Sequence, residues 1–141
     1  MIVLVTGTVG LDKRSYLQQA EKICRANGHD FELVHIGDLM YKELPDIASG
    51  RILDLPLTTL KSVRRSVFKD VIQKAKCGQH LIINTHATFR WKHGLHPAID
   101  FEQLAAAALT HLLATCMDSV ICLTQNKTPI LGSVSEYMTR L

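Results

Sequence analysis

MIVLVTGTVGLDKRSY, residues 1–16, is the stretch that decides the predicted fold. It opens with Ile2-Val3-Leu4-Val5, a run of aliphatic residues that is typical of a buried strand. Two glycines, Gly7 and Gly10, then predict a turn, and a helical pattern begins near Asp12. A strand that passes through a glycine turn directly into a helix predicts an α/β protein.

The glycine turn and the residues after it have the layout of a P-loop, in which backbone N–H groups and a helix N-terminus hold phosphate oxygens. Gly7 and Lys13 fit the pattern G-x-x-x-x-G-K-[ST], but Asp12 stands where glycine is expected and Arg14 where a hydroxyl is expected. Ser15 supplies a hydroxyl one residue later. A plain glycine turn between a strand and a helix is the alternative interpretation. The candidate phosphate-binding residues of the turn are Gly7, Thr8, Gly10, Asp12, Lys13 and Ser15.

The rest of the chain alternates between strand and helix patterns. Further strands are predicted at 31–36, 80–84 and 118–124. Helices are predicted at 12–26, 39–44, 60–76 and 101–115, and a last helix from Thr128-Pro129 onward. Residues 45–59 are interpreted as a mobile connection. We therefore expect one domain, residues 1–141, with a parallel sheet covered on both faces and any ligand at the carboxyl ends of the strands.

Composition and charge exclude several classes of protein. With 47% hydrophobic and 21% charged residues, the chain has the composition of a soluble globular domain. No apolar run approaches the about 20 residues of a membrane span. The four cysteines form no C-x-x-C pair and lie mostly in apolar patterns, so we expect reduced thiols and a cytoplasmic protein. The net charge of +3 suits small anionic molecules.

The predicted helix 60–76 is amphipathic, with Val63, Val67 and Val71 on its inner side. We interpret its basic residues as a solvated outer face, because no aromatic residues interleave with them as they do on nucleic-acid surfaces. Nucleic acid is therefore not an expected partner. The basic residues are Lys61, Arg64, Arg65, Lys69, Lys74 and Lys76.

Polar residues follow the second and third predicted strands. Asn84 ends the third strand, where a P-loop protein usually presents an acid to Mg²⁺, and His86 follows it. Gly37 and Asp38 come directly after the second strand. Each has a structural alternative: Asn84 closes a strand, His86 holds its loop, and Asp38 caps a helix.

Two arginines are candidates for anion binding. Arg90 can bind a phosphate through two N–H groups, and Arg51 can close over an anion or remain solvated. His93 and His96 lack two further ligands at usable spacing, so they do not predict a metal site.

Several segments in order resemble archaeal-type adenylate kinase and its nucleoside-monophosphate-kinase relatives. The resemblance rests on the first strand and loop and on VHIGDLM at 34–40, LIINTHATFRWKHGLHP at 81–97 and DSVICLTQNKTPIL at 118–131. It covers nearly the whole chain. It implies a P-loop NTPase-like three-layer sandwich with a parallel sheet of order 2-3-1-4 that lacks the fifth strand of longer relatives.

The resemblance also implies an activity: transfer of the γ-phosphoryl group of ATP to a nucleoside monophosphate with Mg²⁺. Gly7, Gly10 and Lys13 would hold the donor phosphates, and 37–60 would be a flexible flap over the monophosphate. The candidates for catalysis are Lys13, Arg14 and Arg90, and Ser15 and Asn84 are those for the metal. The candidates for substrate binding are Gly37, Asp38, Arg51, Asn84, His86, Arg90 and His93.

Departures from the family pattern leave other functions open. Asp12, Arg14 and Asn84 replace a glycine, a metal-binding hydroxyl and an aspartate, and the arginine-bearing lid, fifth strand and final helix have no counterpart. We expect Arg14 to supply part of the missing cationic charge. The alternatives are a non-catalytic nucleotide sensor or interaction module, or a nucleotide hydrolase or transferase. An exposed edge at 118–124 would favour a homo-oligomer, and a longer natural chain would add a further domain.

Overall fold

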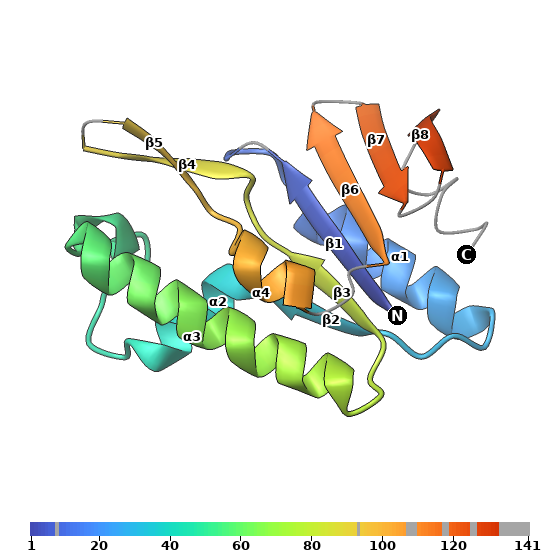
Figure 1. Cartoon of the computed structure of the whole chain (residues 1–141), viewed down its shortest axis with the longest axis horizontal. Helices are drawn as coiled ribbons and strands as arrows, with labels where there is room; N and C mark the ends of the chain where they lie inside the picture. Colours follow the sequence, from blue (N-terminus) through green and yellow to red (C-terminus); the bar gives the residue numbers. More distant parts are fainter. Residues whose placement is uncertain (8, 93, 107–109, 117–118, 125–126, 133–141) are drawn as a thin grey trace.

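The computed structural model describes residues 1–7, 9–92, 94–106, 110–116, 119–124 and 127–132 (Figure 1). Its main sheet has six strands in the order β2-β3-β1-β6-β7-β8. The strands β2, β3, β1 and β6 are parallel, and β7 and β8 extend the sheet by antiparallel pairing. The strands are β1 (Ile2–Gly7), β2 (Glu32–His35), β3 (Leu81–Asn84), β6 (His111–Cys116), β7 (Ser119–Thr124) and β8 (Lys127–Gly132). The protein is thus α/β with a parallel four-strand sheet.

Helices cover both faces of the parallel strands, as the alternating pattern predicted. They are α1 (Arg14–Ala26), α2 (Ile36–Glu43), α3 (Leu57–Lys76) and α4 (Phe101–Ala106), with a short 3₁₀ turn at Ile52–Asp54. The helix α1 lies on one face of the sheet, and α2, α3 and α4 lie on the other (Figure 1).

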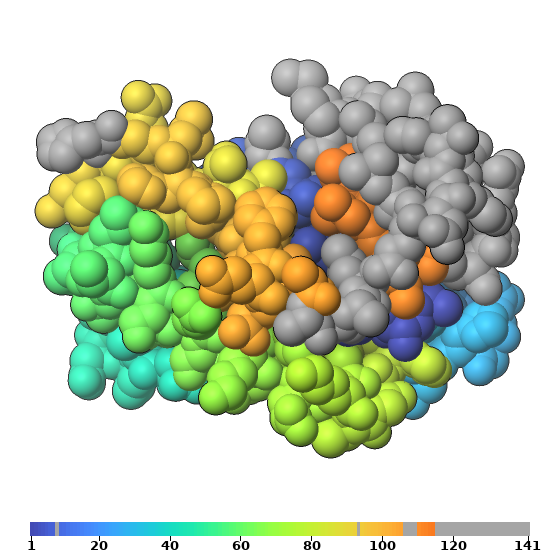
Figure 2. Space-filling model, viewed as in Figure 1, coloured from blue at the N-terminus to red at the C-terminus, as the bar shows by residue number. Residues whose placement is uncertain are grey.

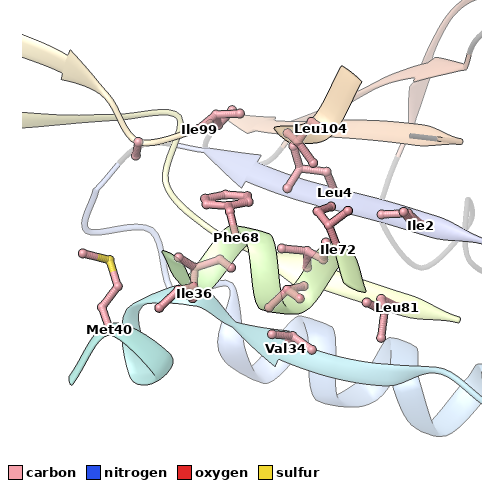
Figure 3. Close-up of a cluster of buried hydrophobic side chains, with 14 of the residues drawn as sticks. Ile2, Leu4, Val34, Ile36, Met40, Phe68, Ile72, Leu81, Ile99 and Leu104 are labelled. Atoms are coloured by element: carbon pink, nitrogen blue, oxygen red, sulfur yellow. The ribbon is translucent and has the colours of Figure 1, made fainter. Parts of the chain in front are cut away.

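Successive residues of β1 point to opposite faces and so enter two separate cores. On one face, Ile2 and Leu4 pack with Phe68 and Ile72 of α3 (Figure 3). On the other face, Val3 and Val5 pack with buried residues of α1, namely Leu17, Ala20 and Cys24. A strand buried on both faces explains why residues 2–5 are a continuous aliphatic run.

A two-stranded hairpin, β4 (Thr88–Trp91) and β5 (Gly94–Pro97), lies outside the main sheet. The indole Nε1 of Trp91 donates a hydrogen bond to the carbonyl oxygen of Leu55 at 3.1 Å. In the space-filling view the hairpin and α4 lie next to α3 on the same face of the molecule (Figure 2). The strands β4 and β5 were not among those predicted from the sequence.

The strand beside β1 differs from the sequence prediction. Residues 101–115 were predicted as one helix, but α4 ends at Ala106 and β6 begins at His111. The apolar run 111–116 fits either element, and pairing with β1 on one side and β7 on the other satisfies its backbone groups as a strand. The predicted fourth strand, 118–124, is the antiparallel β7 instead, so the parallel strand at that place is β6.

The carboxyl-terminal prediction also needs correction. Residues 127–132, where a helix was predicted, form β8 at the edge of the sheet. An edge strand tolerates Pro129, which cannot donate to a ladder. The strand β7 is paired on both sides, so the expectation of an exposed edge at 118–124 is wrong. The homo-oligomer stays a prediction without that support. The rest of the predicted last helix, 133–141, lies outside the described residues.

Other boundaries shift by a few residues. The helix α2 begins at Ile36, which was predicted to end a strand, and α3 begins at Leu57. The segment 37–60, expected as a flap, holds most of α2, the 3₁₀ turn and the start of α3. The Tyr41 hydroxyl accepts a hydrogen bond from the Gly50 backbone N–H at 2.8 Å.

Within the residues described, none of the helices is long and apolar enough to cross a membrane.

Candidate functional site

The carboxyl ends of β1, β2 and β3 meet at a pocket of about 220 Å³. Parallel pairing aligns these ends, because His35 of β2 and Val5 of β1 both lie opposite Asn84 of β3. The starts of α1 and α2 and one residue of α3 complete the wall. The lining residues are Leu11, Asp12, Lys13, Arg14, His35, Ile36, Gly37, Asp38, Met40, Arg64, Asn84, Thr85, His86 and Ala98.

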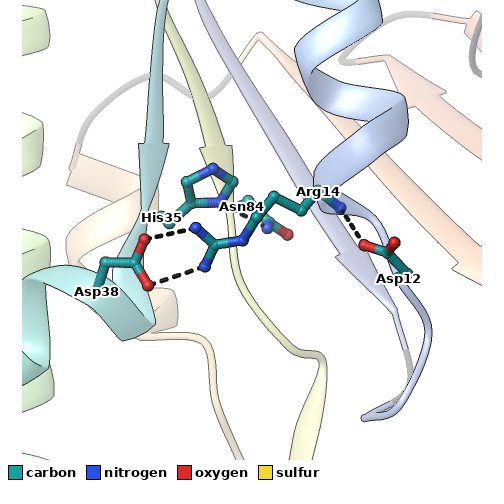
Figure 4. A network of polar contacts seen from close by, with 5 residues as sticks. All are labelled: Asp12, Arg14, His35, Asp38 and Asn84. Carbon is teal, nitrogen blue, oxygen red and sulfur yellow. Dashed lines mark hydrogen bonds and ion pairs between the residues drawn. The ribbon is translucent and has the colours of Figure 1, made fainter. Parts of the chain in front are cut away.

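Asp12 occupies the N-terminus of α1. Its Oδ1 accepts a hydrogen bond from the backbone N–H of Arg14 at 3.0 Å (Figure 4). Its Oδ2 accepts a weaker bond from the Ser15 hydroxyl at 3.4 Å. A carboxylate is favoured at a helix N-terminus, where the first N–H groups have no partner within the helix. The chain's own carboxylate therefore holds a place that a phosphate oxygen takes in a P-loop.

Lys13 is a buried cation without a polar partner in the described part of the chain. Only 5% of the residue is exposed, and its ammonium makes no hydrogen bond or ion pair there. Desolvation lowers the pKa of the amine from its ordinary 10.5, and the nearby charge of Asp12 partly opposes this. A buried charge that lacks a partner is costly, so an anion in the pocket would stabilise Lys13.

Arg14 reaches across the pocket to Asp38 in the first turn of α2 (Figure 4). Its Nη1 and Nη2 each donate to one carboxylate oxygen of Asp38 at 2.9 Å. The hydrogen bonds from Arg14 hold the pKa of Asp38 below its ordinary 3.8. The two side chains are 55% and 48% exposed, so the pair contributes at most about 1 kcal/mol to stability.

His35 and Asn84 form a polar pair close to the Arg14 side chain (Figure 4). The amide Nδ2 of Asn84 lies 2.9 Å from Nδ1 of His35, and since an amide nitrogen only donates, the imidazole nitrogen accepts. This bond requires neutral His35, in agreement with a pKa lowered below 6.5 by desolvation and then by the charge of Arg14. The buried Oδ1 of Asn84 has no hydrogen-bond partner among the residues described.

Arg64 is a site residue that the sequence did not identify. Its guanidinium lies 4.4 Å from the centre of the Phe89 ring, and its Nη1 approaches the Pro97 carbonyl oxygen at 3.5 Å. Its buried Nε has no hydrogen-bond partner in the described structure, and desolvation lowers its pKa to about 10. At neutral pH the guanidinium stays charged. The solvated position predicted for Arg64 is therefore wrong, and Arg64 lies in the pocket wall.

His86 lies at the rim of the same pocket. The residue remains exposed, but partial desolvation, followed by the charges of Lys13 and Arg64, lowers its pKa below 6.5. His86 is thus close enough to Lys13 and Arg64 for their charges to disfavour the protonated imidazole. The three groups give this side of the pocket a positive potential at acidic pH, and Lys13 and Arg64 alone maintain it at neutral pH.

The structure brings together seven of the predicted site residues and separates others. The seven are Asp12, Lys13, Arg14, Gly37, Asp38, Asn84 and His86. Ser15 lies outside the lining, with its hydroxyl donated to Asp12. Arg51 pairs with Asp54, and Arg90 is exposed on β4; neither lines the pocket. Thr8 and His93 lie outside the described residues.

The glycines of the loop have different structural roles. Gly7 is the buried last residue of β1, and its carbonyl oxygen accepts the Ala87 N–H at 2.9 Å. Gly10 is exposed, with φ +93°, a conformation that favours glycine. Neither is among the pocket-lining residues. Their assignment as phosphate ligands stays a prediction.

Simple signals in the sequence point to the two residues that were missed. Arg64 is spaced four residues from Leu60 and from Phe68, both fully buried, so it lies along the apolar stripe of α3. His35 is the last residue of β2 and pairs in register with Asn84. Polar residues that end neighbouring parallel strands share one edge of the sheet.

Side chains that commonly bind metal ions are sparse around any one point in the described part of the chain. Among the residues described, no three His, Cys, Asp or Glu side chains are grouped so that they could hold a metal. Mg²⁺ commonly keeps several waters and uses few protein ligands together with substrate phosphates. Asp12, Asp38 and Asn84 are the acidic and carboxamide side chains that line the pocket.

Comparison of the sequence with models of protein families and with curated proteins finds no match.

Proposed function

We propose that the protein is a P-loop-type domain that binds a nucleotide through phosphate in the pocket at the carboxyl ends of β1, β2 and β3. The observation that carries the proposal is Lys13: a lysine with 5% exposure, beside the pocket, without a hydrogen bond or ion pair in the described structure. A bound anion would compensate the buried charge. Arg64 adds a second desolvated cation to the pocket lining.

The position of the pocket supports this proposal. The strand β1 turns directly into α1, and β3 and β6 lie on either side of β1, so the sheet order changes direction there. Open α/β sheets bind ligands at such a point, outside the carboxyl ends of the strands. A P-loop NTPase-like three-layer sandwich is the specific fold that we propose for this arrangement.

Adenylate-kinase-like phosphoryl transfer between ATP and a nucleoside monophosphate is the reaction that we propose for testing. Lys13, Arg14 and Arg64 place three cations around one pocket, and phosphoryl transfer depends largely on positioning and charge stabilisation. Ser15 and Asn84 remain the proposed contacts to Mg²⁺, and Arg90 the proposed contact to the acceptor.

A non-catalytic nucleotide sensor or interaction module is the rival function. The observation that favours it is the carboxylate of Asp12 at the N-terminus of α1. This carboxylate accepts a hydrogen bond from one of the backbone N–H groups that a phosphate chain would use, and it places a negative charge beside the other N–H groups of the helix N-terminus. A nucleotide hydrolase or transferase that uses the altered loop is a further alternative, and it would bind the same class of ligand.

Calorimetry with ATP, ADP, AMP and GTP, each with and without Mg²⁺, tests the proposal on the full chain. We expect at least one nucleotide to bind and Lys13→Ala to weaken it by tenfold or more. Lys61→Ala, on the exposed side of α3, is the matched control. If the folded wild-type protein binds none of the four nucleotides, the proposed function is wrong. A coupled assay for ADP formation then separates a kinase from a sensor.

A further inference from the structure

The start of α1 is already occupied by the chain. Asp12 accepts hydrogen bonds from the Arg14 N–H at 3.0 Å and from the Ser15 hydroxyl at 3.4 Å. In a P-loop of the usual sequence these groups face the β- and γ-phosphates and their metal ion. A polyphosphate in that position would lie against the Asp12 carboxylate, and two like charges at such a distance repel each other.

Two cations of the pocket lining have no carboxylate partner among the described residues. Arg14 is engaged by both oxygens of Asp38. Lys13 is nine-tenths or more buried, and neither it nor the Arg64 guanidinium has a carboxylate partner among the described residues. The Nε of Arg64 is a buried donor without an acceptor. These two side chains, one directly before α1 and the other on α3, line the same pocket and offer charge and hydrogen-bond donors to a compact anion.

The size of the pocket agrees with a compact anion. Its volume is about 220 Å³. Pockets that enclose a drug-sized ligand usually measure about 300–1,000 Å³. A phosphate group with the atoms next to it fits a space of this size, and the remainder of a larger ligand would extend through the open side.

We propose that the pocket binds the single phosphate group of a phosphomonoester on Lys13 and Arg64 without Mg²⁺, and that Asp12 excludes the longer phosphate chain of a triphosphate. The inference rests on the proposed binding of a nucleotide through phosphate and narrows its ligand; it therefore favours the nucleotide sensor over phosphoryl transfer from ATP. Two cations can neutralise a phosphate dianion directly, so no metal ion is required. The carboxylate of Asp12 acts as a fixed internal anion. Its charge limits the number of phosphate groups that the bound ligand can carry.

The first test compares inorganic phosphate, AMP and ATP by calorimetry on the full wild-type chain, in EDTA and in Mg²⁺. We expect phosphate and AMP to bind in EDTA, Mg²⁺ to change their affinity by less than threefold, and ATP to bind no tighter than AMP. ATP that binds at least tenfold tighter than AMP and only with Mg²⁺ overturns this inference but upholds the proposed function. Binding of none of these ligands, nor of ADP or GTP, overturns both.

The second test removes the charge of Asp12 and keeps its shape. Asparagine is also a good acceptor at a helix N-terminus, so Asp12→Asn should fold. We expect the ratio of ATP affinity to AMP affinity to rise by tenfold or more. The matched control is Asp70→Asn on the exposed side of α3. An unchanged ratio in a folded Asp12→Asn protein overturns the part assigned to Asp12.

The third test addresses the two cations. Arg64→Gln should weaken phosphate and AMP binding by at least tenfold, whereas Arg65→Gln, at the neighbouring exposed position, should change it by less than twofold. Arg64→Lys keeps a charge but loses the planar group on Phe89, and should recover part of the affinity. Equal affinities of folded Arg64→Gln and wild type overturn the part assigned to Arg64. Circular dichroism and thermal unfolding of every variant establish that it is folded.

Discussion

Arg14 binds both carboxylate oxygens of Asp38 at 2.9 Å and so joins the first turn of α1 to the first turn of α2. The pair lies close to His35 and Asn84, which line the same pocket (Figure 4). It holds a basic side chain, which could otherwise face an anion, on an internal carboxylate. The residue that follows Lys13 is therefore used to connect two helices.

Asp38→Asn should release Arg14 at little cost in stability. Both side chains are about half exposed, so we expect the free energy of unfolding to fall by at most about 1 kcal/mol. Phosphate affinity should rise severalfold, because a negative charge is removed and a cation becomes available. Urea unfolding and calorimetry measure the two effects. Asp54→Asn, which removes the exposed partner of Arg51, is the control; weaker phosphate binding by Asp38→Asn would contradict the prediction.

Arg14→Ser should make ATP binding more dependent on Mg²⁺. The substitution restores the hydroxyl of the P-loop pattern and removes a cation that could take part of the metal's role. A Mg²⁺ titration of ATP affinity measures the change, with Arg25→Ser at the exposed end of α1 as the control. Equal metal dependence in Arg14→Ser and wild type would exclude this compensating role for Arg14.

Asn84→Asp should raise the pKa of His35. The new carboxylate would lie where an amide now sits 2.9 Å from the imidazole, and an adjacent negative charge favours the protonated form. NMR titration of the histidine signals measures the shift, and Asn84→Ala, which adds no charge, is the control. A pKa of His35 that stays as low in Asn84→Asp as in wild type would show that the two side chains do not interact in solution.

Stability should fall as the pH drops below about 6.5, the ordinary histidine value. Desolvation comes first among the causes that lower the pKa of His35, His86 and His111. Between the lowered folded value and 6.5 the unfolded chain binds more protons, so the free energy of unfolding rises with pH in that window and levels off above it. Asp38 acts separately: the stability it gains from its lowered pKa is full above 3.8 and is lost as the pH falls through the folded value.

Urea unfolding at pH 7.5, 6.5 and 5.5 measures the histidine effect. His35→Gln should reduce the dependence on pH, and His29→Gln, at an exposed position after α1, should not. A free energy of unfolding that is constant across this range would contradict the burial-based shifts.

Phe68→Ala should destabilise the fold by about 3–5 kcal/mol, the usual range for removing a buried aromatic side chain. Phe68 is fully buried between α3 and the sheet (Figure 3). Phe101→Ala is the matched control, because that ring is 65% exposed. Denaturant titration of both variants measures the difference, and similar losses in the two would place the core elsewhere.

The sequence around residues 1–16 was enough to predict a buried strand, a turn and a helix, because local periodicity and glycine positions carry that information. The same holds for α3 and β3, which lie close to the helix predicted at 60–76 and the strand predicted at 80–84. The short apolar run 111–116 was assigned to a helix, since its spacing of leucines suits both structures and its partner strands are distant in the chain.

The candidate site was partly visible in the sequence. The strand ends and the loop lysine pointed to one edge of a parallel sheet, and Asp12, Lys13, Asp38, Asn84 and His86 do line one pocket there. Arg64 was assigned to the solvated face of α3. The sequence of this helix contains six basic residues, and their pattern alone does not distinguish the one that contacts Phe89.

By itself, then, the sequence of residues 1–16 determined a strand, a glycine turn and a helix with a lysine at its start. What Lys13 and its neighbours contact was decided by tertiary structure. Asp12 accepts a hydrogen bond from the first residue of α1, and Arg14 binds Asp38. Arg64 lines the same pocket from a helix that begins more than forty residues later in the chain. Local pattern specifies which backbone conformation a segment prefers, but burial and charge pairing depend on which distant segments pack against it.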